Sequence, residues 1–95
     1  MKELKIGDVS RNGQVTIVDE DRLCYQVRSS SKGAVGIRTI SKKLLGEFVE
    51  YFAKHPDATS SDARNDLSGM SDIDKFEYGY NSTLTIIAKM VLEID

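Results

Sequence analysis

The hydrophobic pattern of this 95-residue chain changes its period near residue 40, and this change constrains the fold more than any other feature. Before that point, apolar residues alternate with polar ones, which is the period of a half-buried strand. After it, they recur every three or four residues, which is the period of an amphipathic helix. The pattern therefore predicts an α+β fold, in which a small antiparallel sheet of three to four strands is covered by two to three helices.

The turns of the predicted sheet are marked by polar segments. Asn12-Gly13 predicts a tight hairpin turn of type I′, because both residue types accept a positive φ. A second turn is expected at 19–22 and a third turn or loop tip at 29–33. The alternating apolar residues between and after these turns are expected to line the strands: Val15 and Ile17, then Leu23, Tyr25 and Val27, then Val35 and Ile37.

The first two predicted helices have recognisable ends. Ser41 is a suitable N-cap for the first, because its side-chain oxygen can accept a bond from an otherwise unpaired backbone N–H. This helix is expected to end before Pro56, since proline disfavours the helical conformation of the preceding residue. Thr59 and Asp62 have the spacing of a capping box at the start of a short helix over 60–67.

A longer apolar stripe predicts the third helix. Its residues step by three or four positions: Ile73, Phe76, Tyr80, Leu84, Ile87 and Val91. Gly79 and Asn81 are weak helix formers, so either one helix runs through them or two helices meet near Asn81-Ser82, and we favour the single helix. The stripe continues almost to Asp95 without a C-cap, which leads us to expect that the chain is part of a longer protein.

Composition and length indicate one domain, residues 1–95, with 1–40 mainly β and 41–95 mainly α. Hydrophobic residues make up 40% of the chain and charged residues 29%, a balance typical of globular proteins. No run of about 18 apolar residues is present, so we expect no association with a membrane. The single cysteine, Cys24, is consistent with a reducing compartment, and a cytoplasmic location is predicted.

The sequence lacks the residue numbers and spacings that metal or cofactor chemistry requires. One histidine and one cysteine cannot supply the four ligands of a structural zinc site, and the acidic residues lack the spacing of a calcium loop. The glycines near Lys32 match neither a phosphate-binding loop nor a dinucleotide fingerprint. His55 and Cys24 are not placed together by any known catalytic spacing. We therefore expect no metal, no small-molecule cofactor, no catalytic residues and no enzymatic activity.

The net charge of −2 is unevenly distributed. The first 43 residues contain nine basic and five acidic residues, whereas residues 44–95 contain four basic and ten acidic residues. Residues 28–43 contain no acidic residue and are rich in hydroxyl groups, which donate to phosphate as guanidinium and ammonium groups do. A nucleic-acid-binding site is predicted at six residues of this stretch: Arg28, Ser30, Lys32, Arg38, Lys42 and Lys43.

The position of Lys42 and Lys43 strengthens this prediction. Both fall in the first turn of a predicted helix, where positive charge opposes the helix dipole and where an anion is favoured. We therefore predict a nucleic-acid-binding accessory or recognition module, with DNA as the favoured partner. The alternative is a protein-interaction or inhibitory module that presents an acidic helical face to a basic protein partner. The acidic residues of that face are Asp57, Asp62, Asp66, Asp72 and Asp74.

Overall fold

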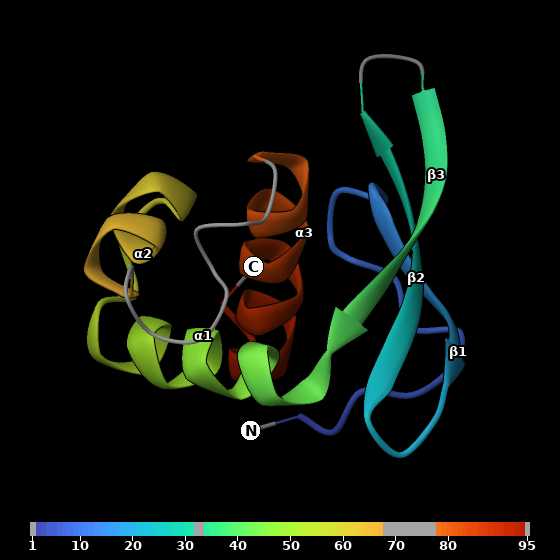
Figure 1. Ribbon diagram of the computed structural model, residues 1–95, viewed down its shortest axis with the longest axis horizontal. Helices are drawn as coiled ribbons and strands as arrows, with labels where there is room; N and C mark the ends of the chain where they lie inside the picture. The colour runs from blue at the N-terminus through green and yellow to red at the C-terminus, as the bar shows by residue number, and fades with distance from the viewer. Residues whose placement is uncertain (1, 32–33, 68–77, 95) are drawn as a thin grey trace.

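A computed structural model of the protein describes residues 2–31, 34–67 and 78–94. Within these residues, three strands and three helices follow one another along the chain: β1 (Val15–Glu20), β2 (Cys24–Ser31), β3 (Ala34–Ser41), α1 (Lys42–Lys54), α2 (Ser60–Leu67) and α3 (Tyr78–Leu92). The strands form an antiparallel sheet in the order β1-β2-β3. The helices lie together on one side of this sheet (Figure 1). The predicted α+β class is confirmed.

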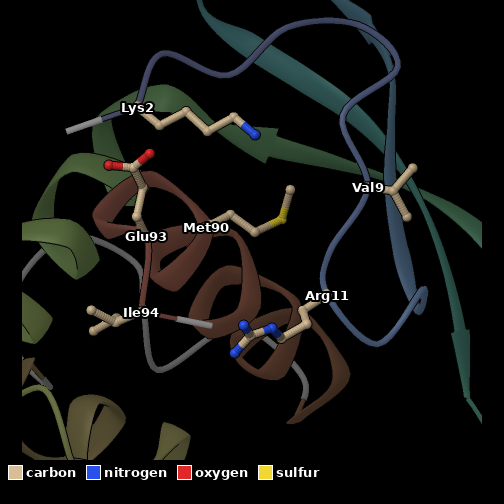
Figure 2. A pocket seen from close by; sticks show the side chains of 6 residues that line it. All are labelled: Lys2, Val9, Arg11, Met90, Glu93 and Ile94. Atoms are coloured by element: carbon tan, nitrogen blue, oxygen red, sulfur yellow. The ribbon is translucent and has the colours of Figure 1, made fainter.

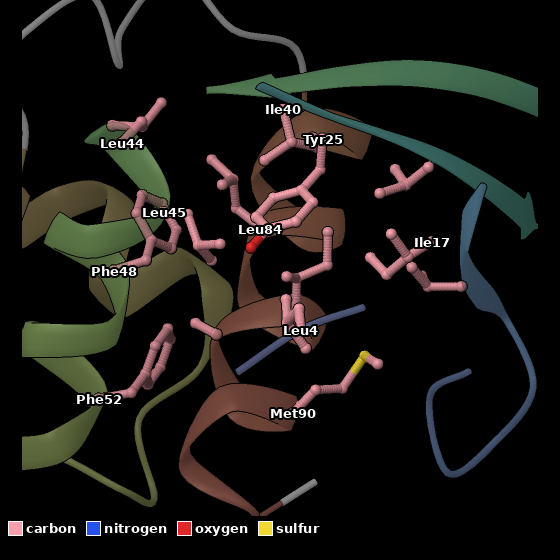
Figure 3. Close-up of a cluster of buried hydrophobic side chains, with 14 of the residues drawn as sticks. Leu4, Ile17, Tyr25, Ile40, Leu44, Leu45, Phe48, Phe52, Leu84 and Met90 are labelled. Atoms are coloured by element: carbon pink, nitrogen blue, oxygen red, sulfur yellow. The ribbon is translucent and has the colours of Figure 1, made fainter. Parts of the chain in front are cut away.

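The core lies between the sheet and helices α1 and α3 (Figure 3). On the helical side, Phe48 and Phe52 of α1 are fully buried, with their ring centroids 6.2 Å apart. Burial of such side chains is the main favourable term in folding, at about 25 cal/mol per Å² of apolar surface. The largest fully buried side chains come from both layers: Val15, Ile17, Val27, Ile40, Phe48, Phe52, Leu84 and Ile87.

The turn between β1 and β2 is held by Asp21. Its carboxylate accepts hydrogen bonds from the backbone N–H groups of Leu23 and Cys24, each at 2.8 Å. These bonds favour the charged form and lower the pKa of Asp21 below its ordinary value. The turn therefore includes Leu23, whose side chain is exposed, so the prediction that Leu23 lines the buried face of the strand was wrong.

The turn before β1 differs from the predicted type. Gly13 has a φ of 76°, but Asn12 does not adopt a positive φ, and a type I′ turn requires both. The Asn12 side chain instead accepts a hydrogen bond from the backbone N–H of Gln14 at 3.1 Å. Local side-chain bonding of this kind competes with the tight hairpin geometry, so the type I′ prediction was wrong although a turn does occur here.

The expected third turn at 29–33 is also corrected. β2 continues to Ser31, and the ladder with β3 pairs Ser29 with Gly36, Ser30 with Val35 and Ser31 with Ala34. Serine has a turn preference in isolation, but pairing with a neighbouring strand overrides it. Residues 32 and 33, including the predicted site residue Lys32, lie outside the described residues.

The face of the sheet on which the apolar side chains of β3 lie also differs from the expectation. Ile40 pairs with Tyr25 and both are buried, so the positions that alternate with Ile40 face away from the helices. Val35 and Ile37 are among those positions, and their exposed fractions are 66% and 59%. The apolar residues of this strand thus mostly face solvent, whereas the alternating pattern suggested a buried face.

The predicted helix ends are mostly confirmed. The Ser41 hydroxyl accepts a bond from the N–H of Leu44 at 3.3 Å, and α1 ends at Lys54, before the proline. The reciprocal capping box of α2 is present, with Thr59 N–H donating to the Asp62 carboxylate at 2.9 Å and Asp62 N–H donating to the Thr59 hydroxyl at 3.2 Å. α3 runs without a break past 81–82, which confirms the single helix in this part of the chain. Its predicted start, with Ile73 and Phe76, lies outside the described residues.

α3 has a defined C-terminal cap that the sequence did not reveal. The N–H of Glu93 donates to the carbonyl of Met90 at 3.1 Å, and the N–H of Ile94 donates to the carbonyl of Lys89 at 3.0 Å. These two bonds form a Schellman motif, in which the residue after the helix adopts the left-handed conformation. That residue is Glu93, with a φ of 60°, where glycine is the usual choice.

Replacing Glu93 with glycine should therefore stabilise the protein. The substitution removes the Cβ that makes the left-handed conformation costly, and the net gain should be about 0.5–1 kcal/mol after the greater flexibility of glycine in the unfolded chain is counted. Urea unfolding followed by circular dichroism measures this difference. Glu93→Ala removes the same carboxylate but keeps the Cβ, so it should give no gain; equal stability of the two variants would contradict the prediction.

The capping box makes the stability of α2 depend on pH. The hydrogen bond from the Thr59 N–H lowers the pKa of Asp62 below its ordinary value, so the folded state favours the carboxylate. Its contribution to stability is present at neutral pH and is lost as the pH falls below about 4 through the lowered pKa of the folded state. Wild type should thus be more stable than Asp62→Asn at pH 7, and the difference should shrink in acid unfolding measurements. A difference that stays constant down to pH 3 would argue against this role.

Candidate nucleic-acid interface

The hairpin formed by β2 and β3 extends beyond the helices that cover the base of the sheet (Figure 1). Among the side chains that the structure describes, the last buried residue along β2 is Val27 and the first along β3 is Ile40. Ser29, Ser30 and residues 35–38 lie between these positions and the tip, and they are exposed or half-buried. This part of the hairpin is held mainly by strand pairing, and its surface is accessible to a large partner.

The register defines an outer face of the sheet, which points away from the helices. Residues that pair directly across an antiparallel ladder lie on the same face. Starting from Arg28, which pairs with Thr16 on one side and Ile37 on the other, the ladder assigns ten residues to the outer face: Thr16, Asp19, Cys24, Gln26, Arg28, Ser30, Val35, Ile37, Thr39 and Ser41. Of the predicted site residues, Arg28 and Ser30 are on this face.

Arg28 is the exposed cation of the outer face. Its side chain is classed with the solvent-exposed residues, and its neighbours on β1 and β3 are uncharged. Ser30 is half-buried, and its backbone N–H donates to the carbonyl of Gln14 at 2.9 Å. Arg28 is therefore accessible to a ligand, whereas the backbone of Ser30 helps to attach the hairpin to the turn before β1.

Arg38 lies on the opposite face of the hairpin from Arg28. It pairs with Val27, whose side chain points into the core, and it is half-buried. One flat partner resting on the outer face thus reaches Arg28 but not Arg38. The structure does not bring the two arginines together on a single surface.

Lys42 is engaged in the structure of the domain itself. Its ammonium lies 2.7 Å from the carboxylate of Glu20 and 4.8 Å from the ring centroid of Tyr25. The hydrogen bond to Glu20 raises the pKa of Lys42. The backbone N–H of Lys42 also donates to the carbonyl of Leu23 at 2.9 Å. These contacts join the start of α1 to the β1–β2 turn, and they reduce the charge that Lys42 offers to a ligand.

Lys43, the next residue, is exposed in the first turn of α1. This turn contains no acidic residue. The positive charge of Lys43 stands where the helix dipole favours an anion. Among the two lysines predicted at this helix start, Lys43 is therefore the better candidate for contact with phosphate.

Base stacking on this sheet has little support. Tyr25 is the one aromatic residue of the three described strands, and it faces the core with an exposed fraction of 8%. Its pKa is raised, mainly because burial disfavours the charged phenolate. Recognition of single-stranded RNA usually depends on aromatic side chains that stack on bases. The described strands therefore present no aromatic side chain on which an unpaired base could stack.

Two features of the outer face were not predicted as part of the site. Val35 and Ile37 are exposed there, next to Arg28. Gln26 and Thr39 pair across the strands and are joined by a hydrogen bond from the Thr39 hydroxyl to the Gln26 side-chain oxygen at 2.9 Å. The sequence did contain a signal for this arrangement. Successive residues of a strand point to opposite faces, so Val35, Ile37 and Thr39 cannot lie on the same face as Ile40.

The acidic residues of the alternative hypothesis are partly committed to internal bonds. Asp62 caps α2, as described above. Asp66 accepts a hydrogen bond from the Tyr51 hydroxyl at 2.7 Å, which raises the pKa of Tyr51 to about 12. Asp57 is exposed, and Asp72 and Asp74 lie outside the described residues. Two of the three carboxylates in view therefore have structural roles that explain their presence.

A cavity of about 260 Å³ lies between the N-terminal segment and the C-terminal end of α3 (Figure 2). It is lined by Lys2, Val9, Arg11, Met90, Glu93 and Ile94. The backbone N–H of Lys2 donates to the carbonyl of Val91 at 2.7 Å, and the Lys2 ammonium is 3.8 Å from the Asp8 carboxylate. These contacts attach the N-terminal segment to α3. The volume is below the range of about 300–1,000 Å³ typical of small-molecule sites, and we assign no ligand to it.

In the described parts of the chain, no three histidine, cysteine, aspartate or glutamate side chains gather closely enough to hold a metal ion. Within those parts, every helix is too short or too polar to span a lipid bilayer.

The two adjacent lysines should differ in their effect on stability. Lys42→Ala removes the contacts with Glu20 and Tyr25 and should lower the melting temperature, whereas Lys43→Ala removes an exposed charge that opposes the helix dipole and should leave the melting temperature unchanged or slightly higher. Thermal unfolding followed by circular dichroism compares the two variants directly. Equal losses would show that the contacts of Lys42 add nothing beyond its charge.

Comparisons with known proteins identify no relative of this chain. A scan against protein-family models and searches of curated proteins and of solved structures found no match to the chain.

Proposed function

We propose that this domain binds duplex DNA through the β2–β3 hairpin and the start of α1, and that it acts by binding rather than by catalysis. The observation that carries the proposal is the accessible hairpin, which presents Arg28 on an open face within a stretch, 28–43, that contains no acidic residue. Phosphate groups attract such a surface, and neutralising them releases bound counterions.

The two exposed cations are well separated along the surface. Arg28 is opposite Ile37, four residues before Ser41, and Lys43 follows Ser41 by two residues. At about 3.4 Å per strand residue, Arg28 is on the order of 13 Å from the start of α1 along β3. A compact anion does not span this distance, but a nucleic-acid backbone does. This spacing supports an extended polyanion as the ligand.

DNA is favoured over RNA for two reasons. The major groove of B-form DNA is wide enough, at about 12 Å, to admit a β-structure, whereas the major groove of A-form RNA is too narrow for protein side chains to read. Tyr25, the aromatic residue of the described sheet, faces the core and does not offer a stacking surface for unpaired bases. Both considerations support a double-stranded DNA partner.

The salt dependence of binding tests the proposal. Wild-type protein should bind a fluorescent duplex of random sequence, and the affinity should fall steeply as the salt concentration rises from about 50 to about 200 mM. Lys43→Ala should reduce the slope of log affinity against log salt concentration by about 1, as expected for one lost phosphate contact. Lys42→Ala is the matched control and should change the slope less, since its charge is paired with Glu20.

Two outcomes of this experiment would contradict the proposal or part of it. If the duplex does not bind even at low salt, the hairpin is not a DNA-binding surface and the proposal fails. If Lys42→Ala and Lys43→Ala reduce the slope equally, the assignment of the phosphate contact to Lys43 is wrong.

A further inference from the structure

The outer face carries side chains that contact with phosphate alone does not explain. Beside Arg28 it presents two β-branched apolar residues, Val35 and Ile37, and a hydrogen-bonded Gln26–Thr39 pair. We infer that this face reads base pairs in the major groove of duplex DNA. The inference rests on the proposed function and specifies which surface meets the bases and what it recognises.

The side chains are arranged in rows across the strands. Nearest the tip, Ser30 is opposite Val35; the next row contains Thr16, Arg28 and Ile37. The third row contains Asp19, Gln26 and Thr39. Each row thus combines a polar group from β2 with a methyl-bearing group from β3. A surface that only neutralises phosphate has no need for this pairing.

The apolar residues are unusual for their position. β3 is an edge strand, and exposed Val or Ile on an edge favours unwanted association with other chains. Natural proteins commonly place lysine or proline there instead. At 66% and 59% exposure, Val35 and Ile37 bury little apolar surface in the isolated domain. Their presence is explained if they become buried against a ligand.

The chemistry of the rows matches the edges of base pairs. Arginine donates two parallel bonds to O6 and N7 of guanine, glutamine pairs with N6 and N7 of adenine, and apolar side chains contact the methyl group of thymine. Arg28, Gln26 and Ile37 supply one group of each kind. The bond from Thr39 orients the Gln26 amide, which lowers the entropic cost of using it for recognition.

The dimensions of the sheet also fit the groove. The strands of the β2–β3 hairpin are about 4.8 Å apart, and the major groove, about 12 Å wide, admits a two-stranded β-ribbon. β-Sheet proteins that read DNA do place strands in a groove in this way. The extension of the hairpin beyond the helices leaves its outer face open to such an approach (Figure 1).

One acidic residue limits the reading surface. Asp19 pairs with Gln26 on the β1 side and is exposed, so its carboxylate repels phosphate at the base of the sheet. Charge complementarity with DNA is therefore greatest from Arg28 toward the tip. This asymmetry directs the duplex toward the end of the hairpin that the helices do not cover.

Selection from a random duplex pool, followed by substitution, tests the inference. Wild-type protein should enrich a short sequence that contains guanine and thymine. Arg28→Lys keeps the charge but loses the paired donors, so it should weaken binding to that sequence by about 5- to 150-fold and leave binding to random duplex unchanged. Replacing thymine by deoxyuridine should weaken wild-type binding several-fold, and Ile37→Ala should bind both duplexes equally.

Leu23→Ala is the matched control for Ile37→Ala, because Leu23 is an apolar residue with a similar exposed fraction, 66% against 59%, but lies in the β1–β2 turn. It should retain the preference for thymine. Salt-dependent binding without any enriched sequence, or a loss of preference in Leu23→Ala as well, overturns base reading while the proposed function stands. Complete absence of duplex binding overturns both, and a protein partner on the outer face then becomes the explanation to test.

Discussion

The direct passage of β3 into α1 determines which surfaces this domain buries and which it leaves open. Ser41 is the last residue of the strand and the N-cap of the helix, so no loop separates the two elements. The junction is tied to the β1–β2 turn by the Lys42 N–H bond to Leu23 and by the Lys42–Glu20 ion pair. Because the helix must leave the sheet on one side, the face with Ile40 is covered and the face with Ile37 is not.

This constraint also separates the basic residues that are adjacent in sequence. Lys42 is directed toward Glu20 and Tyr25, whereas Lys43 is exposed on the helix start. Along the hairpin, strand pairing places Arg28 and Arg38 on opposite faces. A basic stretch that looks uniform in sequence therefore becomes one structural lysine and cations on distinct surfaces. Only the fold can make this distinction, since it depends on long-range pairing.

The sequence predicted what depends on local signals and missed what depends on register. The Ser41 cap and the Thr59–Asp62 capping box were found because each involves residues three positions apart. The exposure of Val35 and Ile37 was missed, because the face of a strand is set by its partner strand. The Glu93 cap was missed for another reason: a left-handed position is normally marked by glycine, and here it is not.

The charge distribution acts together with this geometry. The excess of negative charge lies in residues 44–95, which contain α2, α3 and most of α1, whereas the excess of positive charge lies in residues 1–43, which contain the sheet. Asp62 and Asp66 serve as hydrogen-bond acceptors within the helical side. This charge distribution would repel a polyanion from the helices and attract it to the sheet before any contact forms. In the proposed function, long-range charge would thus bring DNA to the side of the molecule where the open outer face lies, and short-range chemistry on that face would determine what is recognised.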